Sequence, residues 1–376
     1  MPILIRFACF LCVYAILTPT VTCNDNLTSK SWPGEAWRAD DKENPFVIIV
    51  ESTSYKSKFL KSELEREGFK ATAMSHVLNR PGDTNMEGAE VNPFRNFNTF
   101  INSFVFPESF AFYLLWRLGE DWAHMAMCYL RNLLSGVVIY YATAGAFHVF
   151  VYVIDSESLF RTGKRRRPTR ETIKDQIWLA QRSMFLYVAL PVFSDWLIEG
   201  GYTYCYYSME EIGGFGWWLV FTLIYFATVE VGIYWMHRTL HTNKWLYRNV
   251  HSRHHMYKTP ETLTPWASIA FNPVDGILQA SPYVICLLFI PCHYLTHLLM
   301  VFSTAIWATF IHDTMDTELG WVMGARYHTV HHTHYMYNFG QVFSFADWWW
   351  GTLREPDGKT TDKQRGGVGG KVVKGE

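Results

Sequence analysis

HRTLHTNKWLYRNVHSRHH, residues 237–255, and a later related stretch, HTVHH, residues 328–332, contain eight histidines in three short groups. Within each group the histidines are three or four residues apart, a spacing that stacks side chains on one face of a helix. The neutral imidazole is the commonest metal ligand in proteins, and one ion accepts about four to six donors. Eight donors are too many for one ion and suit two. They are His237, His241, His251, His254, His255, His328, His331 and His332.

Histidines outside these groups have a simpler explanation. A histidine that stands alone, such as His124 or His148, is more often packed or hydrogen-bonded than bound to a metal. Eight clustered histidines do not fit that explanation, because adjacent imidazoles repel one another if charged and gain little if neutral. His293 and His297 lie in an apolar segment that we place across the membrane from the three groups, so we assign them to packing. His334 follows the third group at the wrong offset for its face.

The composition indicates a membrane protein. The chain has 376 residues, of which 49% are hydrophobic and 17% aromatic, with 16 Trp and 21 Tyr. Amphipathic aromatic rings favour the bilayer interface, and long apolar runs supply membrane spans. The net charge of −1 gives no reason to expect a nucleic-acid partner. The seven cysteines are scattered, and their one CxxC spacing, Cys9 to Cys12, lies in the apolar start of the chain, so no disulfide framework is predicted.

Four apolar stretches predict the membrane crossings. The last of them is too long for one span, and Pro291 divides it into a hairpin. We therefore predict an all-α integral membrane protein with about four transmembrane helices in hairpins and a cap that carries the histidines. The stretches are residues 133–153, 183–197, 215–236 and 283–311.

A basic loop sets the predicted sidedness. Residues 161–170 carry six arginines and lysines, which places this loop, and the histidine cap two crossings later, in the cytosol. The apolar start of the chain, residues 1–23, is typical of a signal peptide or signal anchor. Residues 24–120 are then a luminal extension, in which Asn26 is a candidate glycosylation site. A membrane domain follows at residues 121–356.

The tail, residues 357–376, is rich in Gly and Lys and is predicted to be disordered.

The residues around the histidines limit the chemistry. A zinc protease needs Glu directly after the first histidine of its pair, and here that residue is Arg238. No cysteine lies near the groups, which excludes a thiolate zinc site. A site made only of histidines suits iron, zinc, copper or nickel. A metal transporter is the remaining non-enzyme alternative, although transporters place their ligands near the membrane midplane rather than after the spans.

The three histidine groups, with nine residues between the first two, resemble those of the fatty acid hydroxylase/sterol desaturase superfamily of membrane di-iron enzymes. The flanking segments TLTPWASIAFNPVDGILQASPYV (262–284), IHD (311–313) and YHTVHHTHYMYNFGQVFSFADWWWGTLREP (327–356) are similar to the sterol C5-desaturase, or lathosterol oxidase, branch. The resemblance covers residues 215–356.

This resemblance implies that the eight histidines bind two iron ions and that His312 is a ninth ligand. Asp316 stands where plant-like relatives often have a further histidine. Three acidic residues are candidates to orient a ligand imidazole through its far nitrogen, namely Glu230, Asp275 and Asp313.

The implied reaction uses O2 and introduces the C5 double bond into a Δ7-sterol. The sterol would enter from the bilayer, a cytochrome b5-type donor would supply electrons, and the enzyme would lie in the endoplasmic reticulum membrane. The alternative within the superfamily is a hydroxylase that acts on a fatty acyl chain or a sterol C4-methyl group.

Overall fold

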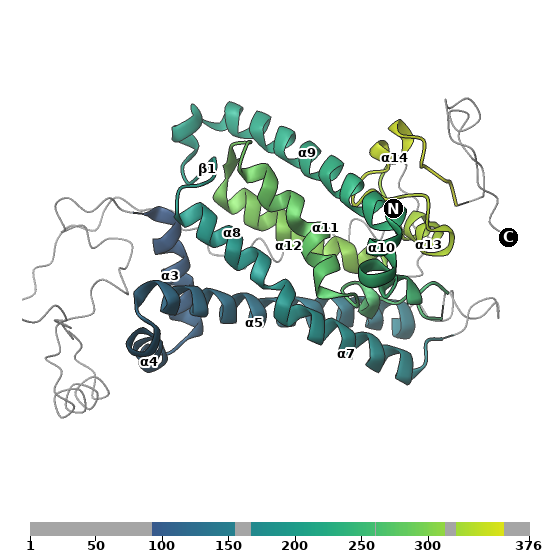
Figure 1. Ribbon diagram of the computed structural model, residues 1–376, viewed down its shortest axis with the longest axis horizontal. Helices are drawn as coiled ribbons and strands as arrows, with labels where there is room; N and C mark the ends of the chain where they lie inside the picture. Colours follow the sequence, from purple (N-terminus) through teal and green to yellow (C-terminus); the bar gives the residue numbers. More distant parts are fainter. Residues whose placement is uncertain (1–91, 155–166, 260, 313–320, 357–376) are drawn as a thin grey trace, which may run out of the picture. The chain divides into compact units, whose positions relative to one another are not determined.

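The computed structural model describes residues 92–154, 167–259, 261–312 and 321–356, and these are mostly helical (Figure 1). Within this part of the chain, four helical segments are long and apolar enough to cross a membrane. They are Glu120–Ile154, Arg170–Glu199, Phe215–Thr242 and Tyr294–Ile311. The predicted all-α membrane fold is therefore confirmed, and each predicted apolar stretch contributes to one of these helices.

The first two membrane helices are longer than their apolar stretches. Helix α5 (Glu120–Val149) continues into a π-helical turn, η1 (Phe150–Ile154), while α7 (Arg170–Tyr187) leads almost directly into α8 (Ala189–Glu199). Pro191 lies in the first turn of α8, where its missing N–H would have had no helical partner. Asp195, which interrupts the apolar run, is buried against Arg131 of α5 at 3.3 Å.

Helix α9 (Phe215–Thr242) carries the first two histidines of the cap in its last turns. It packs against α11 (Pro273–Leu287), and Tyr225, Val229 and Ile233 lie in the core that these helices share. Gly232 allows their close approach, because a Cβ atom at that position would lie 2.8 Å from Cβ of Pro282. Small residues have this effect wherever membrane helices pack tightly.

The apolar stretch at residues 283–311 is a hairpin, as predicted. Its arms are α11, which begins earlier than the stretch, and α12 (Tyr294–Ile311), and Pro291 lies in the turn between them. Beside this turn, the two-residue strands β1 (Cys205–Tyr206) and β2 (Cys292–His293) pair in parallel. The turn after α8, with the 3-10 turn η2 (Met209–Ile212), therefore lies next to the hairpin turn.

Two helices precede the first membrane helix. Helices α3 (Pro93–Val105) and α4 (Glu108–Leu118) both pack on α5. The Asn92 side chain caps α3 by accepting the backbone N–H of Arg95 at 3.1 Å, which explains where α3 begins. The predicted luminal extension, residues 24–120, includes both helices and ends where α5 begins, and its luminal location stays a prediction.

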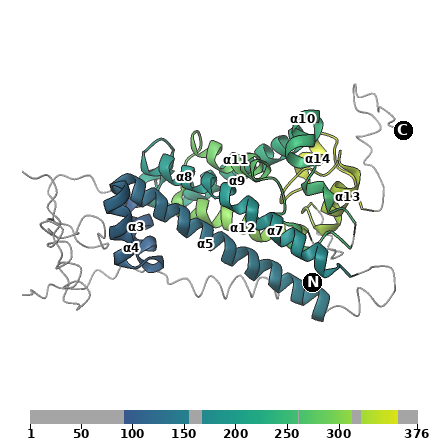
Figure 2. The same ribbon diagram turned by 60° about the horizontal axis from the view of Figure 1, so that its bottom comes forward.

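The cap gathers at the opposite end of the helices from α3, α4 and the strands (Figures 1 and 2). Its elements are short because the chain turns repeatedly to bring histidines together. They are α10 (Lys244–Leu246), the π-turn η3 (Tyr247–His251), the 3-10 turns η4 (His254–Met256) and η5 (Pro265–Ala267), α13 (Ala325–His334) and α14 (Phe345–Trp349).

Several predictions fall outside the described residues. These are the signal segment, Asn26, the extension up to residue 91, most of the basic loop, Asp313, Asp316 and the tail.

Candidate metal centre

Nine buried histidines of the cap form two groups, and they include all eight that the spacing singled out together with His312. In each group the candidate ligand nitrogens all lie within 4.8 Å of one another. The five-histidine group is His237, His241, His251, His255 and His331. The four-histidine group is His254, His312, His328 and His332. The groups adjoin, since the ring centroids of His255 and His332 are 4.6 Å apart.

The distances between Nε2 atoms fit metal ligands. In the five-histidine group, Nε2 of His251 lies 2.8 Å from that of His241, and Nε2 of His255 lies 3.1 Å from both. In the four-histidine group, three consecutive Nε2 pairs are each 3.1 Å apart. Two nitrogens bound at a right angle about 2.1 Å from one ion lie about 3.0 Å apart, whereas tetrahedral ligands lie about 3.4 Å apart. The observed spacing of 2.8–3.1 Å is therefore close to that of nitrogens that bind one ion.

Partners on the far side of four rings point Nε2 into the groups. The Nδ1–H groups of His237, His331 and His312 donate to the carbonyl oxygens of Phe339, Tyr337 and Ala308 at 3.0, 2.8 and 2.6 Å. Nδ1 of His251 donates to Oδ2 of Asp275 at 2.8 Å. A carbonyl can only accept, so Nδ1 carries the proton and Nε2 keeps its lone pair for a metal. Nε2 of His237 and of His331 is buried and has no hydrogen-bond partner.

The electrostatics of the cap keep five of its imidazoles neutral, as metal ligation requires. Burial, together with the neighbouring imidazoles, holds the pKa of four of them well below the usual value: His254, His255, His328 and His332. Burial also lowers the pKa of His331 to about 3. A cation that enters either group therefore meets lone pairs rather than protons.

The two triplets, at residues 251–255 and 328–332, each divide between the two groups. The expectation that the histidines of each triplet lie on one helix face is therefore wrong. In α13, His328 and His332 belong to one group and His331 to the other. Consecutive helical residues are rotated by about 100°, so His331 and His332 point in different directions. His251 and His255 likewise join one group while His254 joins the other, and this segment consists of π and 3-10 turns rather than a regular helix.

Of the three predicted orienting acids, Asp275 contacts a histidine and Glu230 does not. Glu230 is buried in α9, and its Oε2 accepts the backbone N–H groups of Val342 and Phe343, each at 3.0 Å. Seven residues place Glu230 and His237 on a similar face, but also two turns apart, about 10 Å along the helix. The loop at residues 342–343 meets Glu230 there instead. Asp313 lies outside the described residues.

This contact makes a prediction for Glu230. Glu230→Gln should retain most of the activity and metal, because the amide oxygen still accepts both N–H groups and the buried Oε1 already has no partner in the structure. Glu230→Ala should destabilise the fold by about 1–3 kcal/mol for each N–H left unpaired. Thermal unfolding and metal content of the two purified variants would measure this. A Gln variant that folds well but lacks metal would show that Glu230 supports the metal centre and not only the loop at residues 342–343.

The spacing argument missed the loop after α13, which orients two of the histidines. Asp347 is fully buried, and its oxygens accept the N–H groups of Phe339 and Gly340 and the Thr352 hydroxyl, each at 2.8 Å. Asn338 ties the same loop to residue 354 through both backbone groups of Arg354. These bonds fix the carbonyl of Phe339 behind His237. The only sign of this role in the sequence is the position of Asp347, an acidic residue among the aromatic residues at 345–350.

The histidines that we assigned to packing lie away from both groups. His297 is buried and Nδ1 lies 2.9 Å from the Tyr225 hydroxyl, at the hairpin-turn end of the helices, where His293 forms part of β2. His334 is exposed at the end of α13 and contacts the hydroxyl of Thr333. None of the three is among the nine clustered residues.

Comparison with known proteins agrees with this geometry. The sequence profile of the fatty acid hydroxylase family matches residues 222–352. A Delta(7)-sterol-C5(6)-desaturase of Nicotiana tabacum is 38% identical over 67% of this chain and 94% of its own length. A putative Delta(7)-sterol-C5(6)-desaturase 2 of Arabidopsis thaliana is 38% identical over 64% of this chain and 85% of its own length. Lathosterol oxidase of Rattus norvegicus is 32% identical over 59% and 73%. No solved structure matches the chain.

The structure has four apolar helices and, at one end of them, a cap in which nine histidines cluster. These features define a helical membrane protein with a candidate two-metal centre. The chain belongs to the fatty acid hydroxylase family and, within it, to the sterol C5-desaturase branch. It is thus an oxidoreductase, and the resemblance inferred from the histidine groups is confirmed.

Proposed function

We propose that this protein is a di-iron, O2-dependent sterol C5-desaturase that converts a Δ7-sterol to its Δ5,7 product. The observation that carries the proposal is the division of nine buried histidines into groups of five and four, in a chain 38% identical to a plant enzyme of that name. Two ions can be bound in adjoining groups. Histidine nitrogens alone leave the choice of metal open, and the family supplies iron.

The protein's own part in the reaction is to hold ligands and exclude water. All nine histidines would bind iron, and the carboxylate of Asp275 and three backbone carbonyls would keep the protons of four rings on Nδ1. Bound iron supplies the chemistry that reduces O2 to water with two external electrons while two hydrogens leave adjacent sterol carbons. A rigid apolar sterol would reach the cap from the bilayer, along the apolar faces of the membrane helices.

We propose a cytochrome b5-type protein as the electron donor and the endoplasmic reticulum membrane as the location. The cap would face the cytosol. This sidedness is supported by the arrangement of the helices, since the end of α5 and the start of α7 flank the basic loop and lie at the same end as the cap (Figure 2). Positive loops stay on the cytosolic side of a membrane.

The proposed sidedness also predicts on which side of the membrane the N-terminal segment and the C-terminus lie. If residues 1–23 are a signal and the segment after them is luminal, an epitope inserted after Lys30 should be protected from protease in intact microsomes. An epitope at the C-terminus should be digested. Asn26 should carry a glycan. Cleavage of the Lys30 epitope without detergent would reject this topology, while leaving the metal centre untouched.

Product analysis tests the proposed function. Yeast that lacks its C5-desaturase should accumulate the Δ5,7-sterol when it expresses this chain, as measured by mass spectrometry. The family's description favours a second candidate, a hydroxylase acting on a fatty acyl chain or a sterol C4-methyl group. A hydroxylated lipid without the Δ5,7 product would support that candidate and reject the desaturase. Metal uptake without any lipid product would support a transporter.

A further inference from the structure

A third cluster of candidate ligands lies at the other end of the helices from the nine histidines. His124 and Cys128 are one turn apart on α5, and Glu199 is the last residue of α8. Their ligand atoms all lie within 4.8 Å of one another. His124 and Cys128 are buried, and the Glu199 side chain is only 7% exposed. Sequence reasoning treated His124 as an isolated histidine because its partner on α8 is 75 residues away.

The three side chains form a donor set suited to zinc or a similar divalent ion. Imidazole nitrogen, thiolate and carboxylate are the three ligand types that zinc uses. Nε2 of His124 lies 3.6 Å from Sγ of Cys128 and 2.9 Å from Oε1 of Glu199. For bonds of about 2.3 Å to sulfur and about 2.05 Å to nitrogen, tetrahedral geometry separates the two atoms by about 3.5 Å. The nitrogen–sulfur pair therefore needs almost no adjustment.

Two asparagines hold the ligands from outside. Nδ2 of Asn98 donates to Oε1 of Glu199 at 2.7 Å, and Nδ2 of Asn102 contacts Sγ of Cys128 at 3.6 Å. Both asparagines are buried on α3. Hydrogen bonds of this kind orient metal ligands in other proteins. They also explain why α3 packs tightly on α5.

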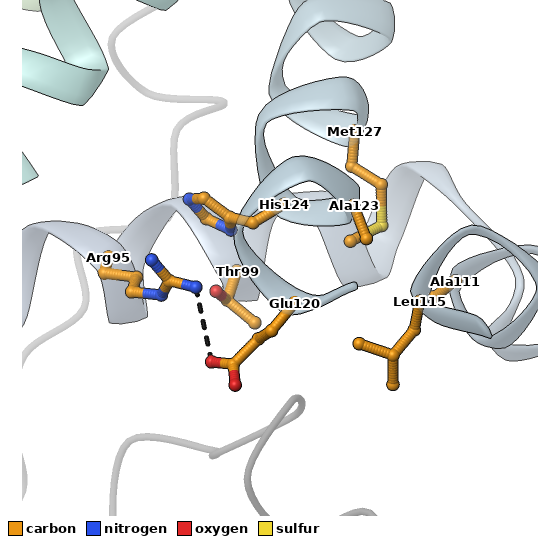
Figure 3. A pocket seen from close by; sticks show the side chains of 8 residues that line it. All are labelled: Arg95, Thr99, Ala111, Leu115, Glu120, Ala123, His124 and Met127. Carbon is orange, nitrogen blue, oxygen red and sulfur yellow. Dashed lines mark hydrogen bonds and ion pairs between the residues drawn. The ribbon is translucent and has the colours of Figure 1, made fainter. Parts of the chain in front are cut away.

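A cavity lies beside His124, one of the three clustered side chains. It has a volume of about 30 Å³ and is lined by Arg95, Thr99, Glu120 and Met127 among others (Figure 3). A water molecule needs roughly 10–15 Å³ of such space. Water could therefore approach the cluster from the His124 side.

The other charged side chains near the cluster are paired with one another. Asp195 is paired with Arg131, and Glu120 and Asp121 are paired with Arg95. The ion pairs seen in the described residues give Glu199 no arginine or lysine partner, only His124. A dication bound to the Glu199 carboxylate and a Cys128 thiolate would make the buried cluster neutral. Buried charge is tolerated when it is compensated in this way.

We propose that His124, Cys128 and Glu199 form a further metal site, which binds zinc or a similar divalent ion and ties α5 to α8. The Cys128 thiol would release its proton to solvent as the sulfur–metal bond forms. The site is separate from the proposed iron centre, since it shares no residue with the two histidine groups.

Cobalt substitution tests this site without relying on enzyme activity. The full-length protein, purified in detergent and titrated with Co²⁺, should show a thiolate-to-cobalt charge-transfer band that saturates at about one ion per chain. The histidine cap cannot produce this band because neither of its groups contains sulfur. Cys128→Ser should abolish the band. His124→Ala should weaken cobalt binding more than about tenfold, because it removes a ligand, and losing a contact that only orients a ligand already costs about tenfold.

The matched control is Cys286→Ser, which changes another buried free thiol, on α11. This variant should keep the band. Both serine variants should retain sterol conversion if the protein is a desaturase, which verifies that they fold. No band in the folded wild-type protein, or a band that survives in Cys128→Ser, would show that the cluster is only a hydrogen-bond network. Neither result would affect the proposed function.

Discussion

Replacing His331 by Ala should abolish sterol conversion, with a loss greater than about 100-fold, because changing only an outer partner of a ligand already lowers activity about 10- to 100-fold. His331 is fully buried, its Nδ1–H is held by the Tyr337 carbonyl, and its Nε2 faces the five-histidine group without any other partner. The variant should still insert into the membrane, since none of the four membrane helices includes residue 331. Sterol profiles from expressing yeast and the iron content of the purified variant would measure both effects.

His334→Ala is the matched control. It removes an imidazole from the same helix, three residues later, but from an exposed position outside both groups. Activity and iron should stay close to the unmodified level. Full activity in His331→Ala, or equal losses in the two variants, would remove the basis for assigning the five-histidine group.

Asp275→Ala should lower iron content or activity by about 10- to 100-fold. Asp275 is fully buried at the start of α11, and its Oδ2 lies 2.8 Å from Nδ1 of His251. Without the carboxylate, the His251 proton can move to Nε2, where it would block the lone pair that faces His241 and His255. Gln279, which donates to Oδ1 of Asp275 at 2.8 Å, would also lose its partner.

Asp275→Asn separates orientation from charge, because its amide oxygen can still accept the His251 proton. Its loss should be smaller than that of Asp275→Ala. Glu230→Gln controls for changing a buried acid that touches no histidine. If Asp275→Ala keeps its iron and activity while folding normally, the contact with His251 is a packing feature only.

Much of the membrane fold could be predicted because the bilayer restricts it so strongly. Apolar runs long enough to span the membrane must be helical, and Pro291 between two such runs forces a turn. The helix ends were harder to predict. α5 begins at Glu120 and α9 continues to Thr242, since helices extend past the apolar core into polar sequence. Helices α3 and α4, of 13 and 11 residues, were missed because such short segments carry little periodic signal.

The candidate metal residues could be identified by spacing, but not their division between two ions. That division depends on the direction of each ring, which differs between His331 and His332 although they are adjacent. It also depends on irregular turns at residues 247–256, which have no clear sequence signal. The outer partners were the hardest to predict. Three are backbone carbonyls, at Phe339, Tyr337 and Ala308, and a carbonyl leaves no trace in residue type.

The iron content of the purified protein tests the two-metal centre most directly. The five-plus-four division predicts roughly two irons per chain in the unmodified protein. His331→Ala and His328→Ala change different groups, so each should lose at least one iron. Sulfur-dependent cobalt or zinc binding at Cys128 is counted separately. A folded, active enzyme with a single iron, or with zinc in the histidine groups and no iron, would contradict the account.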